Sequence, residues 1–131
     1  MGNAEVMRER LERWNRERRL VAEHYSEEFV WDMTHADWPG QDEYHGVDGM
    51  TLFLRDWMGA FDGWDLEVEG ALDTPDGKVV VLATQRGVNR GAGVPVEMRM
   101  AQIWTVDEEG RAVRMEMYTD RARGLAAAGI A

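Results

Sequence analysis

The chain has 131 residues, enough for one domain, and its 44% hydrophobic and 31% charged residues fit a globular protein with a single core. It contains no cysteine, which excludes disulfides and thiolate chemistry and favours a reducing, cytoplasmic location. The net charge of −10 opposes nucleic-acid binding, and no run approaches the about 20 apolar residues that a membrane span requires. The charged start MGNAEVMRER lacks the apolar centre of a secretory signal, so no secretory signal is expected. The length predicts a single domain over residues 1–131.

The first third of the chain predicts two helical regions around one strand. Residues 3–24 carry apolar residues at helical spacing, which indicates one bent helix or two short ones with a break near Trp14. Residues 27–33 read as a strand, and residues 34–46, with one proline and two glycines, read as a loop. Asp48 is placed to cap a second helix, which Gly59 and Gly63 end.

From Trp64 onward, apolar residues recur at every second position between glycine-containing turns. The turns DTPDG, NRGAGVP and DEEG separate four predicted strands, which are residues 64–72, 78–88, 96–106 and 111–120. Helices followed by an antiparallel meander predict an α+β domain. The tail GLAAAGIA is either a short helix or a frayed end.

The last two strands have faces of opposite character, because side chains alternate across a sheet. One face combines four methionines with an amide and an indole: Met98, Met100, Gln102, Trp104, Met115 and Met117. The opposite face carries charged and aromatic residues, namely Arg99, Arg114, Glu116 and Tyr118. The methionine-rich face is either a filled hydrophobic core or the lining of a ligand cavity. A buried Gln102 without partners would cost about 1–3 kcal/mol, which favours the cavity.

The stretch FVWDMTHADWP places a carboxylate, Asp32, at the end of an apolar strand. Asp32 is a solvated strand end, a hydrogen-bonded structural acid, or a general base whose pKa is raised by desolvation. His35, three residues later, could share a proton with it or face solvent. The spacing D-x-x-H is too common to indicate a metal, and no third ligand is positioned by the sequence, so no metal is expected. His24, at the end of the first helical pattern, is expected to be structural.

Three stretches resemble the SnoaL-like, ketosteroid isomerase-like branch of the nuclear transport factor 2-like superfamily. They are WNRERRLVAEHYSEEFVWD, YHGVDGMTLFLRDW and VEMRMAQIWTVDEEGRAVRMEMYTD, which together span most of the chain. The resemblance implies a single SnoaL-like domain: a cone-shaped α+β barrel, in which a curved antiparallel sheet packs on N-terminal helices around one deep apolar pocket. It also implies a homodimer, and a family whose members include isomerases, polyketide cyclases, dehydratases, epoxide hydrolases and plain ligand-binding proteins.

The resemblance implies roles for individual residues. Asp32 matches the strand end at which ketosteroid isomerases hold their general base, and Gln102 matches their protonated aspartate, an oxyanion-hole donor. The first helix has no tyrosine where those isomerases have a phenolic donor. The epoxide hydrolases of the superfamily use an arginine and two carboxylates, but Met117 stands where an acid is expected. Its dehydratases use histidines from the later strands, and this chain has none after His45.

These observations predict a cofactor-free enzyme that performs acid–base chemistry on a small hydrophobic, carbonyl-containing metabolite, of the isomerase or cyclase type. Asp32 would be the base, Gln102 the oxyanion donor and His35 a proton relay. The expected substrate-binding residues are Val30, Trp38, Tyr44, Trp57, Met98, Met100, Trp104, Met115 and Met117. A non-catalytic binding protein for hydrophobic small molecules is the alternative, and epoxide hydrolase-like or dehydratase-like activity the third.

Overall fold

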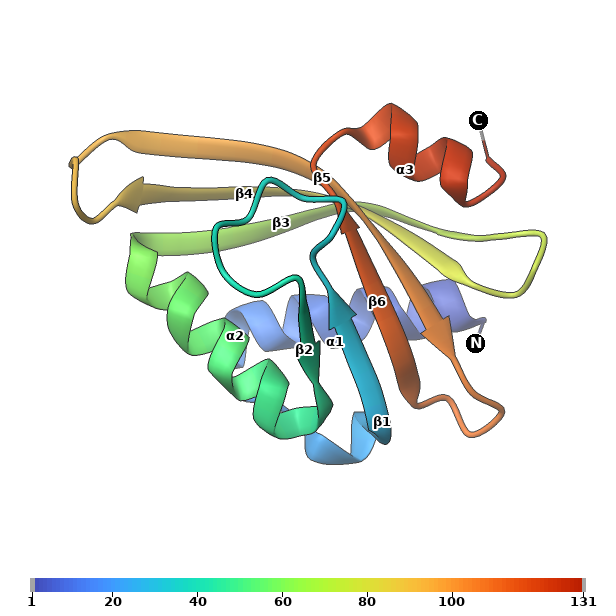
Figure 1. The fold of residues 1–131 in the computed structure, drawn as a ribbon. Helices are drawn as coiled ribbons and strands as arrows, with labels where there is room; N and C mark the ends of the chain where they lie inside the picture. The colour runs from blue at the N-terminus through green and yellow to red at the C-terminus, as the bar shows by residue number, and fades with distance from the viewer. Residues whose placement is uncertain (1, 131) are drawn as a thin grey trace.

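A computed structural model describes residues 2–130, and it arranges them as helices packed on a curved sheet (Figure 1). The helical elements are α1 (Asn3–Glu17), the 3-10 turn η1 (Ala22–His24), α2 (Gly46–Ala60) and α3 (Arg121–Ala127). The strands are β1 (Tyr25–Asp32), β2 (Glu43–His45), β3 (Phe61–Asp73), β4 (Val79–Asn89), β5 (Pro95–Val106) and β6 (Ala112–Tyr118). The predicted α+β class is confirmed.

The described strands form one six-stranded sheet in the order β2-β1-β6-β5-β4-β3. The four strands β3 to β6 form the predicted antiparallel meander. β1 instead pairs with β6 in parallel and with β2 antiparallel, so the sheet is mixed. The sheet is curved but not closed into a barrel, which leaves β2 and β3 as its two edges.

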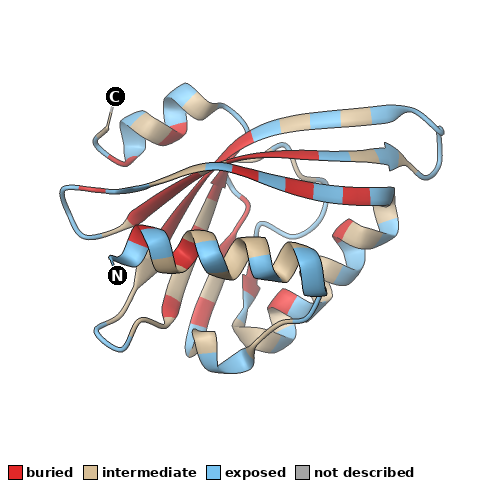
Figure 2. Cartoon of the chain, turned by 180° about the vertical axis from the view of Figure 1, so that it is seen from behind, coloured by how far each residue is buried: buried red, intermediate tan, exposed pale blue. Residues whose placement is uncertain are grey.

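The two faces of the sheet are covered by different helices. α1 and α2 pack on one face, which we call the inner face, and α3 packs on the other, the outer face (Figure 1). Trp31, Met115 and Trp104 are in register across β1, β6 and β5 and are buried in the inner core. The predicted methionine-rich face is this inner face, where Met100 and Met117 are also buried. Figure 2 shows the buried residues concentrated where the strands pass over α1.

α1 ends later than the predicted break near Trp14. Arg18, just after the helix, adopts the left-handed conformation with φ 56°, and its N–H donates to the carbonyl of Trp14 at 2.7 Å. Its guanidinium lies 5.3 Å from the ring centre of Trp14 and 4.7 Å from that of Trp64. Cation–π contacts with two rings help to compensate for a conformation that a non-glycine residue rarely adopts.

The segment predicted as one loop contains the short strand β2. Tyr44 of β2 is buried, and its hydroxyl accepts hydrogen bonds from the indole N–H of Trp38 at 2.9 Å and the backbone N–H of Gln41 at 3.1 Å. α2 starts at Gly46 directly after β2, with His45 rather than Asp48 at the N-cap. These bonds hold the loop between β1 and β2 against the aromatic residues of α2.

α3 covers part of the outer face. Asp120 caps this helix by accepting a hydrogen bond from the backbone N–H of Arg123 at 3.2 Å. Gly124 lies so close to Ala101 and Tyr118 that an added Cβ would be 2.8 Å from the Cβ of Ala101. The terminal helix is therefore docked on β5 and β6 rather than frayed. No helix within residues 2–130 is both long and apolar enough to cross a membrane.

Candidate functional site

A cavity of about 70 Å³ lies between the inner face of the sheet and helices α1 and α2. Space of this size holds several water molecules, and a ligand with a ring would extend from it toward the open side of the cavity. Its wall is mostly aromatic and aliphatic and includes five tryptophans: Trp14, Trp31, Trp57, Trp64 and Trp104. Two amides, Gln85 and Gln102, also line it. An apolar wall with a few polar groups is the usual composition of a small-molecule site.

Gln102 is held in one orientation by its neighbour in β5. The indole N–H of Trp104 donates to Oε1 of Gln102 at 2.9 Å, and both side chains are buried. Nε2 of Gln102 has a weak partner, the Sδ of Met100 at 3.7 Å. Because an indole N–H can only donate, it fixes the amide oxygen on its own side and leaves the amide N–H₂ for a ligand.

The solvent side of the cavity is formed by α1, η1 and the segment between them. We call this region the mouth and define it by Arg10, Arg13, Arg19 and His24, which all line the cavity. Arg13 and Arg19 are also exposed to solvent. Burial, followed by the nearby charges of Arg10 and Arg13, lowers the pKa of His24, so its imidazole is neutral at pH 7.

Tyr25, which follows His24, also lines the cavity. Burial raises the pKa of Tyr25 to about 12, which keeps its hydroxyl protonated at neutral pH. The cavity thus combines a proton acceptor, the imidazole of His24, with protonated donors.

Asp32 lies on the outer face, and the expectation that it points into the cavity is wrong. Its neighbour Trp31 occupies the inner face, and side chains alternate along a strand. Oδ1 of Asp32 accepts from the backbone N–H and hydroxyl of Thr34 at 2.8 and 2.6 Å, and Oδ2 accepts from Arg114 at 2.6 Å. Burial raises the pKa of Asp32, but these hydrogen bonds outweigh burial, so its pKa lies below the ordinary value. This is the geometry of a structural acid.

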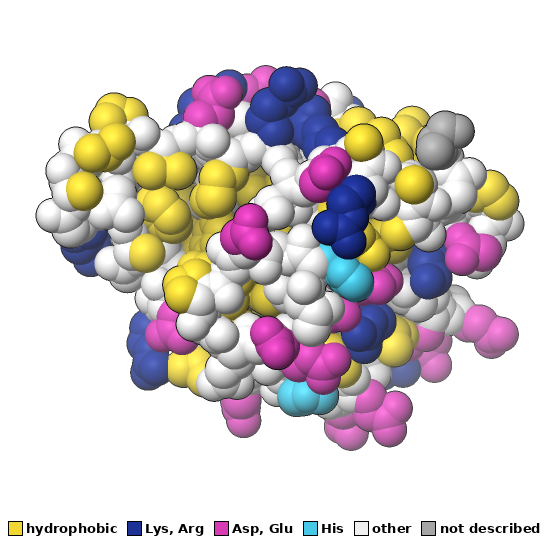
Figure 3. All heavy atoms as spheres, turned by 45° about the horizontal axis from the view of Figure 1, so that its top comes forward, with side chains coloured by type: hydrophobic (Ala, Val, Ile, Leu, Met, Phe, Trp, Pro, Cys, Tyr) yellow, Lys and Arg dark blue, Asp and Glu magenta, His cyan; other side chains and the backbone are white. Residues whose placement is uncertain are grey.

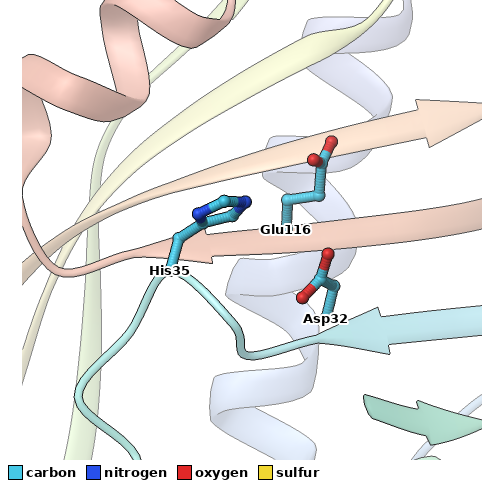
Figure 4. Close-up of side chains that lie close together, drawn as sticks. All are labelled: Asp32, His35 and Glu116. Atoms are coloured by element: carbon cyan, nitrogen blue, oxygen red, sulfur yellow. The ribbon is translucent and has the colours of Figure 1, made fainter. Parts of the chain in front are cut away.

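His35 also lies on the outer face, where its ring stacks on Tyr118 with centroids 4.5 Å apart. One ligand atom from each of Asp32, His35 and Glu116 lies within 4.8 Å of the others, and Figure 4 shows the three side chains lying close together. Both oxygens of Asp32 are already occupied by donors, and the cation Arg114 adjoins the group, which disfavours a metal ion. Figure 3 shows acidic, basic and histidine side chains intermixed on this face.

The structure therefore separates the three predicted catalytic residues. Gln102 is at the cavity, whereas Asp32 and His35 are together on the other side of the sheet. No hydrogen bond or shared cavity links them to Gln102 within residues 2–130.

The predicted substrate-binding residues divide into three groups. Trp57, Trp104 and Met117 line the cavity. Met100 and Met115 are buried in the inner core and Met98 packs against it, but they lie outside the lining, as do Trp38 and Tyr44. Val30 falls on the outer face because it alternates with Phe29 and Trp31, both of which are buried in the inner core.

Sequence reasoning missed the contribution of the first helix and the segment that follows it. Arg10, Trp14, His24 and Tyr25 line the cavity, whereas the sequence pattern predicted a helix break near Trp14 and a structural role for His24. The signal present in the sequence was Tyr25 next to His24, together with the earlier Trp14. Whether these side chains face one cavity depends on where α1 ends, and the predicted break near Trp14 was too early.

The family comparison agrees with this architecture. Residues 7–115 match the family model described as a SnoaL-like domain. The chain belongs to the SnoaL-like domain family. None of the curated proteins matches its sequence significantly.

Solved structures with the same fold share little sequence with this SnoaL-like domain. A nuclear transport factor 2-like protein from Burkholderia thailandensis has a TM-score of 0.76 at 20% identity, covering 95% of this chain and 98% of that one. The epoxide hydrolase/cyclase-like enzyme SalBIII, which acts in pyran ring formation in the polyether salinomycin, has a TM-score of 0.70 at 18% identity, covering 88% of both chains. RV0760c from Mycobacterium tuberculosis, in complex with estradiol-17beta-hemisuccinate, has a TM-score of 0.70 at 14% identity, covering 90% of this chain and 94% of that one. At these identities the likeness establishes the cone-like fold alone.

Proposed function

We propose that this SnoaL-like domain binds a small hydrophobic molecule bearing a carbonyl or similar oxygen in the inner cavity. The observation that carries the proposal is the orientation of Gln102, whose oxygen is occupied by Trp104 at 2.9 Å and whose amide N–H₂ is left to donate. A ligand carbonyl would replace the weak contact of that amide with Met100 by a full hydrogen bond. The aromatic wall would hold the apolar part of the ligand.

Two matched single-ring ligands test this proposal. Acetophenone has a carbonyl, whereas ethylbenzene has a similar shape without an acceptor. We expect both to change the fluorescence of the cavity tryptophans, and acetophenone to bind more tightly. Gln102→Met should weaken acetophenone about tenfold, the size of one lost hydrogen bond, and leave ethylbenzene unchanged.

Gln85→Met is the control, because Gln85 is the other amide that lines the cavity. This variant should keep the preference for acetophenone. Absence of binding by either ligand would contradict the proposed site. Equal losses of acetophenone binding in the Gln85→Met and Gln102→Met variants would contradict the role of Gln102.

A second candidate function is cofactor-free acid–base catalysis of the isomerase or cyclase type. The observation that favours it is the position of His24 in the cavity lining, where burial lowers the pKa and the neutral imidazole can accept a proton from the carbon beside a carbonyl. Gln102 would then donate to the oxygen on which negative charge develops. Asp32, paired with Arg114 on the outer face, is not placed for this step.

Proton abstraction can be followed by exchange of the acetophenone methyl protons for deuterium in D₂O, measured by proton NMR. We expect His24→Gln to abolish protein-dependent exchange and Asp32→Asn to retain it. The reverse result would return the role of base to Asp32.

Epoxide hydrolase-like chemistry has less support, because the cavity lining contains no Asp or Glu within residues 2–130.

A further inference from the structure

The charged residues that line the cavity are all cationic. They are Arg10, Arg13 and Arg19, and among residues 2–130 no Asp or Glu lines the cavity with them. The chain as a whole is acidic, with 25 acidic and 15 basic residues, so its composition does not explain a lining whose charged residues are all cationic. A neutral ligand would gain less than an anion from three guanidinium groups at the mouth.

The three arginines are not equally engaged by protein acids. Arg13 forms an ion pair with Glu17 at 2.8 Å. Arg10 donates to the backbone carbonyl of Gly110 at 2.7 Å, and neither Arg10 nor Arg19 forms an ion pair within residues 2–130. Glu9 and Glu23 lie close enough to act on Arg10 and His24 respectively, but neither lines the cavity. Two guanidinium groups therefore retain charge that a ligand anion can neutralise.

Arg10 should attract an anion more strongly than Arg19 does, because Arg10 is half-buried and Arg19 is exposed. Burial lowers the pKa of Arg10, but a guanidinium remains protonated at neutral pH. A partly desolvated cation interacts more strongly with an anion than an exposed one, because the local dielectric constant is lower. Guanidinium also matches the geometry of a carboxylate better than an ammonium group does.

Two uncharged polar groups of the cavity lining also offer donors. The indole N–H of Trp64, a cavity-lining residue that is 9% exposed, is the buried side-chain nitrogen without a hydrogen-bond partner in the described part of the chain. The amide of Gln102 presents its N–H₂ groups, since its oxygen is bound to Trp104. These donors, like the arginines at the mouth, favour oxygen acceptors on the ligand.

From this arrangement we infer that the ligand is an apolar acid. Its ring or chain occupies the cavity, and its carboxylate lies at the mouth, in the electrostatic field of Arg10 and Arg19. This inference rests on the proposed function and names the chemical class of the molecule bound there. The neighbour RV0760c is in complex with a hemisuccinate, which is consistent with an acidic ligand in this fold.

Phenylacetate and phenylacetamide provide the test, because they share a ring and differ in charge. We expect the intact protein to bind phenylacetate about tenfold more tightly by isothermal titration calorimetry, as for one charge-assisted contact. Raising the salt concentration should reduce this preference, since the mouth is open to solvent. Arg10→Gln and Arg19→Gln should each weaken phenylacetate several-fold and leave phenylacetamide unchanged.

Arg16→Gln is the matched control: Arg16 is an exposed arginine of α1 that does not line the cavity, and its removal changes the net charge equally. It should leave both affinities unchanged. The Arg19→Gln variant should fold normally even if Arg10→Gln does not. Arg19 is exposed and, unlike Arg10, makes no hydrogen bond to the β5–β6 turn. Equal binding of acid and amide, or an effect of Arg16→Gln as large as that of Arg19→Gln, overturns the inference but not the proposed function. Binding of neither probe overturns both.

Discussion

Arg114 and Asp32 form an ion pair at 2.6 Å on the outer face of the sheet, with the Asp32 side chain 5% exposed and the Arg114 side chain 37% exposed. The pair joins β1 to β6, the two strands that run parallel. It lies on the opposite side of the sheet from Gln102, which lines the cavity. The aspartate that most resembles a catalytic base thus has a structural position.

Asp32→Asn should therefore reduce stability rather than ligand binding. The change removes a buried carboxylate that accepts from Thr34 and Arg114, and we expect the free energy of unfolding at pH 7 to fall by about 2 kcal/mol. Chemical denaturation measures this loss. Asp37→Asn, at an exposed aspartate of the loop that follows β1, should change stability by less than about 0.5 kcal/mol. Loss of ligand binding without loss of stability would contradict the structural role.

The same carboxylate predicts a dependence on pH. Because the folded-state pKa of Asp32 is lowered, its contribution to stability is present above the ordinary aspartate pKa and disappears as the pH falls through the folded-state value. The difference in unfolding free energy between the wild type and Asp32→Asn should therefore shrink below about pH 4. Denaturant titrations at pH 7, 4 and 3 would measure this decrease, and a difference that stays constant would contradict the prediction.

The side of the sheet that Asp32 occupies could not be read from the sequence. Phe29, Val30 and Trp31 are all apolar, so the run before Asp32 shows no alternation from which a phase could be inferred. The phase is set by the parallel register with β6, in which Asp32 pairs with Glu116. That pairing joins segments far apart in the chain.

Other parts of the fold were predictable because their signals are local. The strands β3 to β6 have long alternating runs between glycine turns, and the inner position of Met100, Met117 and Gln102 follows from that alternation. β2 has three residues, too few to show a period. The cavity mouth depends on the end of α1 at Arg18, whose left-handed conformation is stabilised by tertiary contacts with Trp14 and Trp64.

His24 predicts a second pH effect, in a different range. Its pKa is lowered by burial and by Arg10 and Arg13, so the unfolded chain binds a proton more readily than the folded one below the ordinary histidine pKa of 6.5. Stability should consequently decrease as the pH falls from 7 to 5, and His24→Gln should reduce this decrease. Denaturation curves at several pH values measure it. Parallel profiles for the two proteins would show that His24 is not the cause.

Tyr44 predicts a coupling between the β1–β2 loop and the core. Tyr44→Phe removes the hydroxyl that accepts from the indole of Trp38 and the backbone of Gln41. Leaving two donors without this acceptor should cost about 1–2 kcal/mol. Hydrogen exchange should accelerate at Gln41 more than in β5. Unchanged exchange in the loop would mean that the ring of Tyr44, and not its hydroxyl, anchors the segment.

Two helical glycines should respond in opposite ways to the same substitution. A Cβ at Gly124 of α3 would lie 2.8 Å from the Cβ of Ala101 and 3.1 Å from that of Tyr118, so Gly124→Ala must push α3 away from the sheet. We expect a loss of about 1–3 kcal/mol in unfolding free energy. Gly59 of α2 has no heavy atom within 4 Å of an added Cβ, so Gly59→Ala should stabilise by about 0.5–1 kcal/mol through helix propensity.

Thermal unfolding of the two alanine variants separates packing from propensity, because the chemical change is the same in both. Hydrogen exchange in the Gly124→Ala variant should increase in α3 and in the facing residues of β5 and β6, since the close contact lies there. Stabilisation by both substitutions would show that α3 is not held against the outer face at Gly124. Ligand binding should be retained in Gly124→Ala, because α3 and the cavity lie on opposite faces of the sheet.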